Sequence, residues 1–85
     1  MKKNNNIVEL KKVRLKIDDI DNKIIKLIAD RFKEIHKVTK LKDDQDQIID
    51  HERITHILKS VQAKAKKNKI DPDIITRIWQ IFIQE

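Results

Sequence analysis

Arginine is scarce in this chain, and its positions are the first place to look for chemistry. The sequence holds 16 lysines but only four arginines, Arg14, Arg31, Arg53 and Arg77. A guanidinium group differs from an ammonium group because its planar fork can hold a carboxylate through two parallel hydrogen bonds. We therefore predict that some of these arginines bind an anion through this fork.

Two charged residues interrupt an otherwise regular apolar seam. Counting on by seven from earlier seam residues, Arg31 and Glu34 occupy positions where apolar residues are expected. A buried arginine is costly unless it is paired. The two residues therefore form a structural pair that sets the helix register, or they mark a pocket for an anion. The other seam residues are Leu10, Val13, Ile17, Ile20, Ile24, Leu27, Val38 and Leu41.

Helix geometry favours the pocket and places further charges around it. Lys42 follows Arg31 by about three turns on the same face, roughly 16 Å away. A connector returning over that gap would bring Asp50 and Arg53 to its mouth. Arg14 lies about 25 Å from Arg31 along the same helix, so it can approach that residue only from an antiparallel second chain.

The composition predicts an all-α fold. The 85 residues include no glycine and one proline, which leaves almost no turn chemistry for β-hairpins. A first helix over about residues 7–42 would be roughly 50 Å long, whereas a compact globule of this size is only about 30 Å across. We expect one domain over residues 1–85, with residues 1–6 as a disordered tail, that forms a homodimer with an antiparallel second chain.

Two further helices are predicted from their end signals. Asp50 is a good N-cap for a second helix, which is expected to fray within residues 64–69. Asp71 and Pro72 supply the cap and the first position of a third helix. Residues 43–49 form a polar connector.

Several classes of site are not expected. The sequence has no cysteine, and His36, His51 and His56 show no metal-ligand spacing. No apolar stretch resembles a signal segment or could span a bilayer, so we expect a cytoplasmic protein without a membrane partner.

The net charge of +6 has three possible explanations: a nucleic-acid partner, an anionic small molecule, or solvated surface lysines. Solvation accounts for most of the lysines. A nucleic-acid module would be supported by Lys2, Lys3 and the lysines of residues 64–69, but aromatic stacking residues and a turn-linked recognition helix are lacking. We expect no nucleic-acid partner.

The arginine spacing resembles one known family. The segments VRLKIDDID (13–21), LIADR (27–31) and IIDHER (48–53), with Lys42 between the last two, resemble the all-helical, type II chorismate mutases. The similarity continues from KIDP (69–72) to Gln80. It implies an intertwined dimer with two active sites and no cofactor, converting chorismate to prephenate in aromatic amino-acid biosynthesis.

The resemblance also implies a role for each site residue. The substrate would be a small dicarboxylate, chorismate or isochorismate, and Arg31, Arg53 and the partner chain's copy of Arg14 would bind its carboxylates. Lys42 would bond a carboxylate and the ether oxygen of the enolpyruvyl group, so Lys42 and Arg31 are the expected catalytic residues. Asp50 would contact a ring hydroxyl.

The chain departs from the mutase pattern in ways that keep alternatives open. Ile54 stands where the mutases usually carry a glutamate, and the related isochorismate-pyruvate lyases, which form salicylate and pyruvate, carry an aliphatic residue there. The family glutamine that assists at the ether oxygen lies further along the last helix than Gln84. An isochorismate-pyruvate lyase and a non-catalytic dimeric regulatory domain are therefore the alternative functions.

Overall fold

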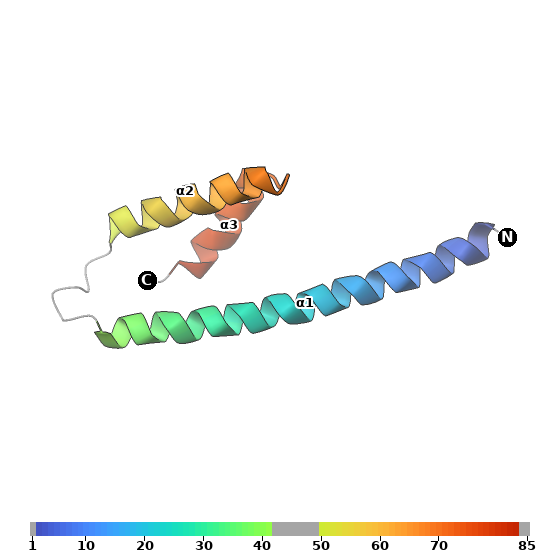
Figure 1. Cartoon of the computed structure of the whole chain (residues 1–85), viewed down its shortest axis with the longest axis horizontal. Coiled ribbons are helices and arrows are strands. Elements are labelled where there is room, and N and C mark those ends of the chain that lie inside the picture. Colours follow the sequence, from blue (N-terminus) through green and yellow to red (C-terminus); the bar gives the residue numbers. More distant parts are fainter. Residues whose placement is uncertain (1, 42–49, 84–85) are drawn as a thin grey trace. The chain divides into compact units, whose positions relative to one another are not determined.

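The computed structural model describes residues 2–41 and 50–83 of the chain. These residues form three α-helices and no strand, which confirms the all-α prediction (Figure 1). The helices are α1 (Lys2–Leu41), α2 (His51–Lys67) and α3 (Pro72–Phe82). The chain divides into two compact parts, Met1–His36 and Lys37–Glu85.

Helix α1 is longer than predicted. Its 40 residues correspond to about 60 Å at 1.5 Å per residue. It begins at Lys2, so residues 2–6 continue the helix instead of forming the expected tail. Extending a helix that already exists adds one hydrogen bond for each residue fixed, whereas starting a new helix is costly. Weak helix formers such as the asparagines can therefore join at its end.

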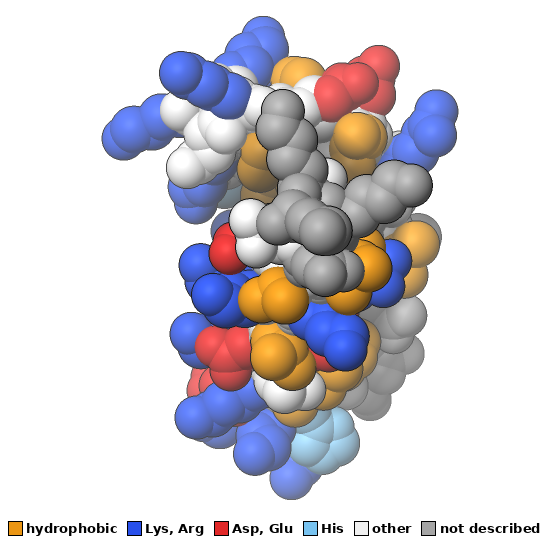
Figure 2. Space-filling model, turned by 90° about the vertical axis from the view of Figure 1, so that its right-hand side faces the viewer, with side chains coloured by type: hydrophobic (Ala, Val, Ile, Leu, Met, Phe, Trp, Pro, Cys, Tyr) orange, Lys and Arg blue, Asp and Glu red, His pale blue; other side chains and the backbone are white. Residues whose placement is uncertain are grey.

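The apolar seam of α1 is exposed in the single chain. Six seam residues keep between 46% and 65% of their surface accessible, and they are Leu10, Val13, Ile17, Ile20, Ile24 and Leu27. Figure 2 shows hydrophobic side chains at the surface among those of lysine and arginine. Within residues 5–41 and 50–83, only Ile57 and Ala65 are buried hydrophobic residues. The described part of the chain therefore has almost no buried apolar core.

Helix α2 starts at the predicted cap and ends in a Schellman motif. The Asp50 side chain accepts a hydrogen bond from the backbone N–H of Arg53. At the other end, the Ile70 N–H donates to the Ala65 carbonyl over 2.8 Å, and Lys69 is left-handed with φ of 59°. The helix is regular through Lys67 and ends within the predicted segment, residues 64–69, in this hydrogen-bonded turn. The motif satisfies carbonyl groups that a frayed end would leave to water.

Helix α3 begins as predicted and packs against α2. The Asp71 side chain accepts a hydrogen bond from the Asp73 N–H over 2.9 Å, and Pro72 is the first residue of the helix. Figure 1 shows α3 folding back along α2 after a tight turn. Between the two helices, the Gln62 side-chain amide donates to the Thr76 hydroxyl over 2.9 Å.

None of the helices in the described ranges is long and apolar enough to cross a membrane.

Candidate active site

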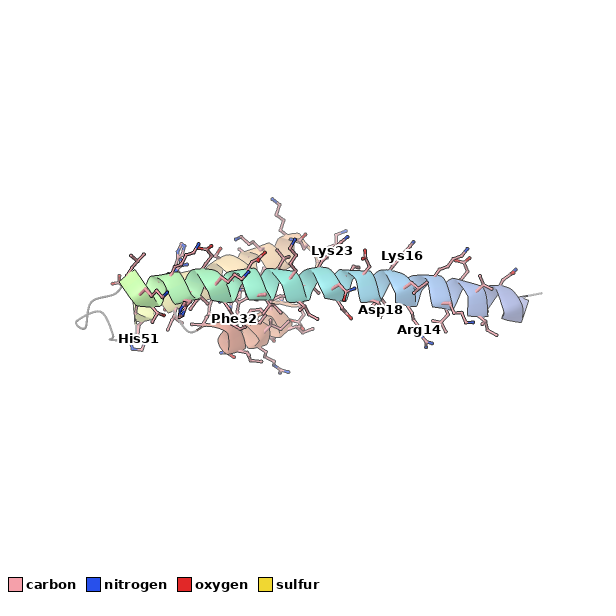
Figure 3. The ribbon with its side chains drawn as sticks, turned by 90° about the horizontal axis from the view of Figure 1, so that it is seen from below. Arg14, Lys16, Asp18, Lys23, Phe32 and His51 are labelled. Atoms are coloured by element: carbon pink, nitrogen blue, oxygen red, sulfur yellow. The ribbon has the colours of Figure 1, made fainter. Side chains whose placement is uncertain are left out.

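Helix α1 carries the first two predicted site residues, Arg14 and Arg31. A continuous helix separates them by 17 positions, which is about 25 Å along its axis. Arg14 is exposed and extends from the side of α1 opposite Lys16 in the view of Figure 3. Within one chain the helix holds these two arginines apart, and only another chain could bring a copy of Arg14 to Arg31.

Arg31 is half-buried, unlike most charged residues of α1. It shares a face with Ile28 and Ile35, which are also half-buried, because the three positions follow the three-and-four spacing of a helix. Arg31 and Glu34 both take part in interactions within the chain. The structural alternative for this pair therefore stays open beside the anion pocket.

The first turn of α2 brings three predicted residues together. The Asp50 Oδ1 atom lies 2.9 Å from the Arg53 backbone nitrogen, and the Asp50 carbonyl accepts from the Ile54 N–H over 3.1 Å. Asp50 and Arg53 are exposed, whereas Ile54 is half-buried. The cap thus fixes the backbone from which the Arg53 guanidinium and the Ile54 side chain extend.

Lys42 and Arg77 belong to neither of these two groups of residues. Lys42, the predicted partner of the ether oxygen, lies outside the described residues. Arg77 is exposed on α3 and belongs to none of the predicted groups. The described part of the chain contains no group of three acidic, histidine or cysteine residues that could hold a metal ion.

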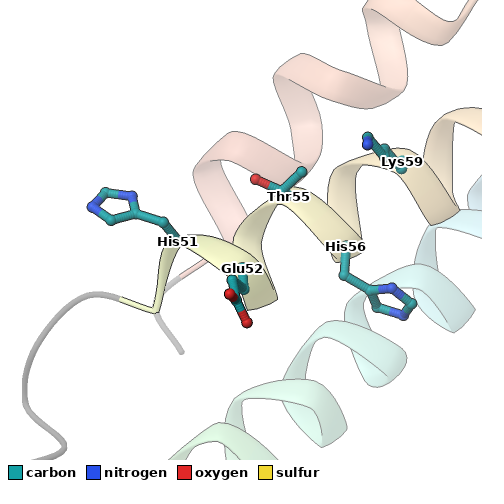
Figure 4. A pocket seen from close by; sticks show the side chains of 5 residues that line it. All are labelled: His51, Glu52, Thr55, His56 and Lys59. Carbon is teal, nitrogen blue, oxygen red and sulfur yellow. The ribbon is translucent and has the colours of Figure 1, made fainter.

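An open hollow on α2 was not predicted. The hollow has a volume of about 420 Å³ and is lined by His51, Glu52, Thr55, His56 and Lys59 (Figure 4). The lining positions recur at mainly helical spacings of three and four, which is the only sequence signal for it. The two histidine side chains point in different directions, so they form no acid–base pair. None of the predicted site residues lines this hollow.

Comparison with known proteins decides the family. Residues 13–85 match the model of the family described as chorismate mutase type II. The chain belongs to the chorismate mutase type II family. The matched range includes Arg14, Arg31, Lys42 and Arg53, which are the basic residues that the sequence analysis placed in one site.

Individual relatives agree with the family match. A chorismate mutase of Methanocaldococcus jannaschii is 38% identical over 79 residues, covering 92% of this chain and 80% of the relative. Two bifunctional chorismate mutase/prephenate dehydratases of Buchnera aphidicola, from the subspecies Acyrthosiphon pisum and Schizaphis graminum, are 34% and 33% identical. These matches cover 85% and 91% of this chain but only 19% and 20% of the relatives. No solved structure is a significant match.

Proposed function

We propose that this chain is an isomerase that converts chorismate to prephenate, a step in aromatic amino-acid biosynthesis. Membership of the chorismate mutase type II family is the observation that carries the proposal. The relative from Methanocaldococcus jannaschii, which is aligned over most of both chains, is itself named chorismate mutase. The substrate is a small dicarboxylate, which agrees with the chemistry inferred from the arginines.

The reaction explains why the site consists mainly of cations. In chorismate the ether C–O bond breaks while a C–C bond forms within the same molecule, so no nucleophile, redox partner or net proton transfer is needed. The protein has to hold a flexible dianion in its folded, reactive conformer. It also has to stabilise negative charge that grows on the ether oxygen as the C–O bond breaks.

Each proposed site residue has one task in that scheme. The Arg31 and Arg53 guanidinium groups, together with Arg14 of the partner chain, hold the two carboxylates. The Lys42 ammonium group binds a carboxylate and the ether oxygen. Asp50 accepts a hydrogen bond from the ring hydroxyl through the carboxylate oxygen that does not cap α2, since an ionised carboxylate has several acceptor sites.

The active unit in this proposal is an intertwined homodimer. Its support is the exposed apolar seam of α1 and the two-residue core of the described part of the chain. Two α1 helices running antiparallel would cover each other's seams and carry each Arg14 toward the partner's Arg31. Each dimer would then contain two sites, and each site would use residues from both chains.

The isochorismate-pyruvate lyase is not the favoured function. Its support in the sequence is the aliphatic side chain of Ile54. The matching family and the relatives described above are named for the mutase reaction. Rearrangement of chorismate is therefore the activity to test first.

The test is to follow the loss of chorismate and the formation of prephenate with the purified chain, its Arg53→Ala variant and the matched control Arg77→Ala. Losing a bidentate, charge-assisted contact to a carboxylate should lower kcat/KM at least roughly a hundredfold for Arg53→Ala. Arg77→Ala removes the same kind of side chain from an exposed position outside the proposed site, so it should keep kcat/KM within about twofold. A wild-type chain that does not convert chorismate would refute the proposed function.

A further inference from the structure

Arg14 has a carboxylate neighbour one helical turn away. Asp18 follows it by four positions on α1, and residues with this spacing have Cβ atoms roughly 5–6 Å apart. Figure 3 shows Arg14 and Asp18 on one side of the helix, while Lys16 and Lys23 extend on the other. Arg14 and Asp18 are both exposed.

Two acidic residues of α1 form ion pairs with lysines of the same helix, and Asp18 is not one of them. Asp19 forms an ion pair with Lys23 over 3.3 Å, and Glu9 forms one with Lys12 over 3.6 Å. Neither Asp18 nor Arg14 has an ion pair with another described residue. The chain therefore places an uncommitted carboxylate beside the arginine that has to act in another protomer.

We propose that Asp18 is a positioning residue that orients the Arg14 guanidinium toward the substrate in the partner's site. This inference rests on the proposed function and on the antiparallel dimer. A guanidinium has five N–H donors, so one edge can hold the substrate carboxylate while another donates to Asp18. Fixing the long arginine side chain before substrate binds lowers the entropy lost on binding.

The sign of the effect separates positioning from simple electrostatics. A carboxylate near the site repels a dianionic substrate, so on charge alone Asp18→Asn should improve binding. If Asp18 instead orients Arg14, the same substitution weakens binding, because the guanidinium loses its second partner. The two explanations thus predict opposite changes in KM.

The experiment measures kcat and KM for chorismate with the dimer of the 85-residue chain, for Asp18→Asn alone and for Asp18→Asn in an Arg14→Gln background. We expect Asp18→Asn to raise KM about tenfold. This change is larger than the loss of an exposed ion pair on a helix would cause, and smaller than the loss of a charge-assisted hydrogen bond that is shielded from water. The kcat value should change less than about twofold, since the contact acts in binding. With Arg14→Gln already present, Asp18→Asn should change KM less than about twofold, because nothing remains to be oriented.

Controls separate this role from general damage to α1. Asp19→Asn removes the neighbouring carboxylate, which already pairs with Lys23, and should leave KM within about twofold. Asp18→Glu keeps the carboxylate and should restore most of the lost affinity. Circular dichroism and sedimentation should show the same helical dimer for all variants.

Three outcomes would overturn the inference: a lower KM for Asp18→Asn, an equal rise in both backgrounds, or the same rise for Asp19→Asn. A wild-type dimer that does not convert chorismate would instead refute the proposed function itself.

Discussion

At the scale of single residues, Asp50 combines a structural contact with a proposed functional one. Its Oδ1 atom caps α2 through the Arg53 N–H, and in the proposed site its carboxylate also accepts from the substrate hydroxyl. Both contacts depend on an oxygen acceptor, but only the second involves chorismate. Substitutions that keep the cap can therefore separate catalysis from stability.

We predict that Asp50→Asn keeps the stability of the protein while lowering activity. Asparagine caps helices about as well as aspartate, so the free energy of unfolding should change by less than about 0.5 kcal/mol. Exchanging a charged acceptor for a neutral one should lower kcat/KM for chorismate about tenfold. Asp50→Ala is the control, and it should also lose about 1 kcal/mol of stability because the cap is absent. Unchanged activity in both variants would place Asp50 outside the substrate site.

Ile54 is the site position at which this chain departs from the mutases, which usually carry a glutamate there. It is half-buried directly after Arg53 and cannot accept a hydrogen bond from a hydroxyl. A glutamate there would give the ring hydroxyl a second acceptor beside Asp50, and a hydrogen bond to a charged group is worth roughly 1.5–3 kcal/mol. We predict that Ile54→Glu raises kcat/KM for chorismate about tenfold relative to that for isochorismate, measured for both variants in one buffer. An unchanged ratio of the two constants would show that position 54 does not contact the ring hydroxyl.

At the scale of the helices, the starts of α2 and α3 could be predicted because their signals are local. Asp50 and Asp71 supply cap oxygens within three residues of the N–H groups that they satisfy. The start of α1 has no such cap in the sequence, so its extension back to Lys2 could not be predicted. The left-handed conformation of Lys69 was also missed, because that conformation is usually adopted by glycine or asparagine.

Glycine at the left-handed position of the turn between α2 and α3, residue 69, should stabilise the protein. The left-handed conformation costs a residue with a Cβ atom about 1–2 kcal/mol, and glycine avoids this cost. Glycine also makes the unfolded chain more flexible, which offsets roughly 0.4–1 kcal/mol of the gain in stability. Lys69→Gly should therefore stabilise the protein by about 0.5–1 kcal/mol, which is a rise of a few degrees in Tm, roughly 2–8 °C. Thermal unfolding followed by circular dichroism measures this change.

A glycine inside the helix should have the opposite effect. Lys67 is the last residue of α2, and Lys66 lies one position before it in regular helix. Lys66→Gly should destabilise the protein by about 1 kcal/mol because glycine is a poor helix former. If Lys69→Gly also lowers Tm, the left-handed position is not a source of strain.

At the scale of the whole molecule, the seam of α1 is the feature that a single chain cannot explain. The spacing of the seam could be predicted from the sequence, and the structure confirms that these residues lie on one long helix. The residues that cover them could not be predicted from spacing alone, because the contacts would be made by another chain. The same reasoning applies to the site, since a rigid helix keeps Arg14 and Arg31 of one chain about 25 Å apart.

In the proposed dimer, each active site combines Arg14 of one chain with Arg31 of its partner. Mixing Arg14→Ala and Arg31→Ala chains tests this sharing, after each variant alone is shown to keep only a small residual activity. Unfolding and refolding an equal mixture gives heterodimers as half of the dimers, and each heterodimer has one intact and one doubly damaged site.

Chorismate turnover of the refolded mixture should therefore reach about a quarter of the wild-type value in a two-fold symmetric dimer. If mass spectrometry shows that heterodimers form and the activity stays at the level of the single variants, the two arginines do not act together across the dimer, and the shared site is refuted.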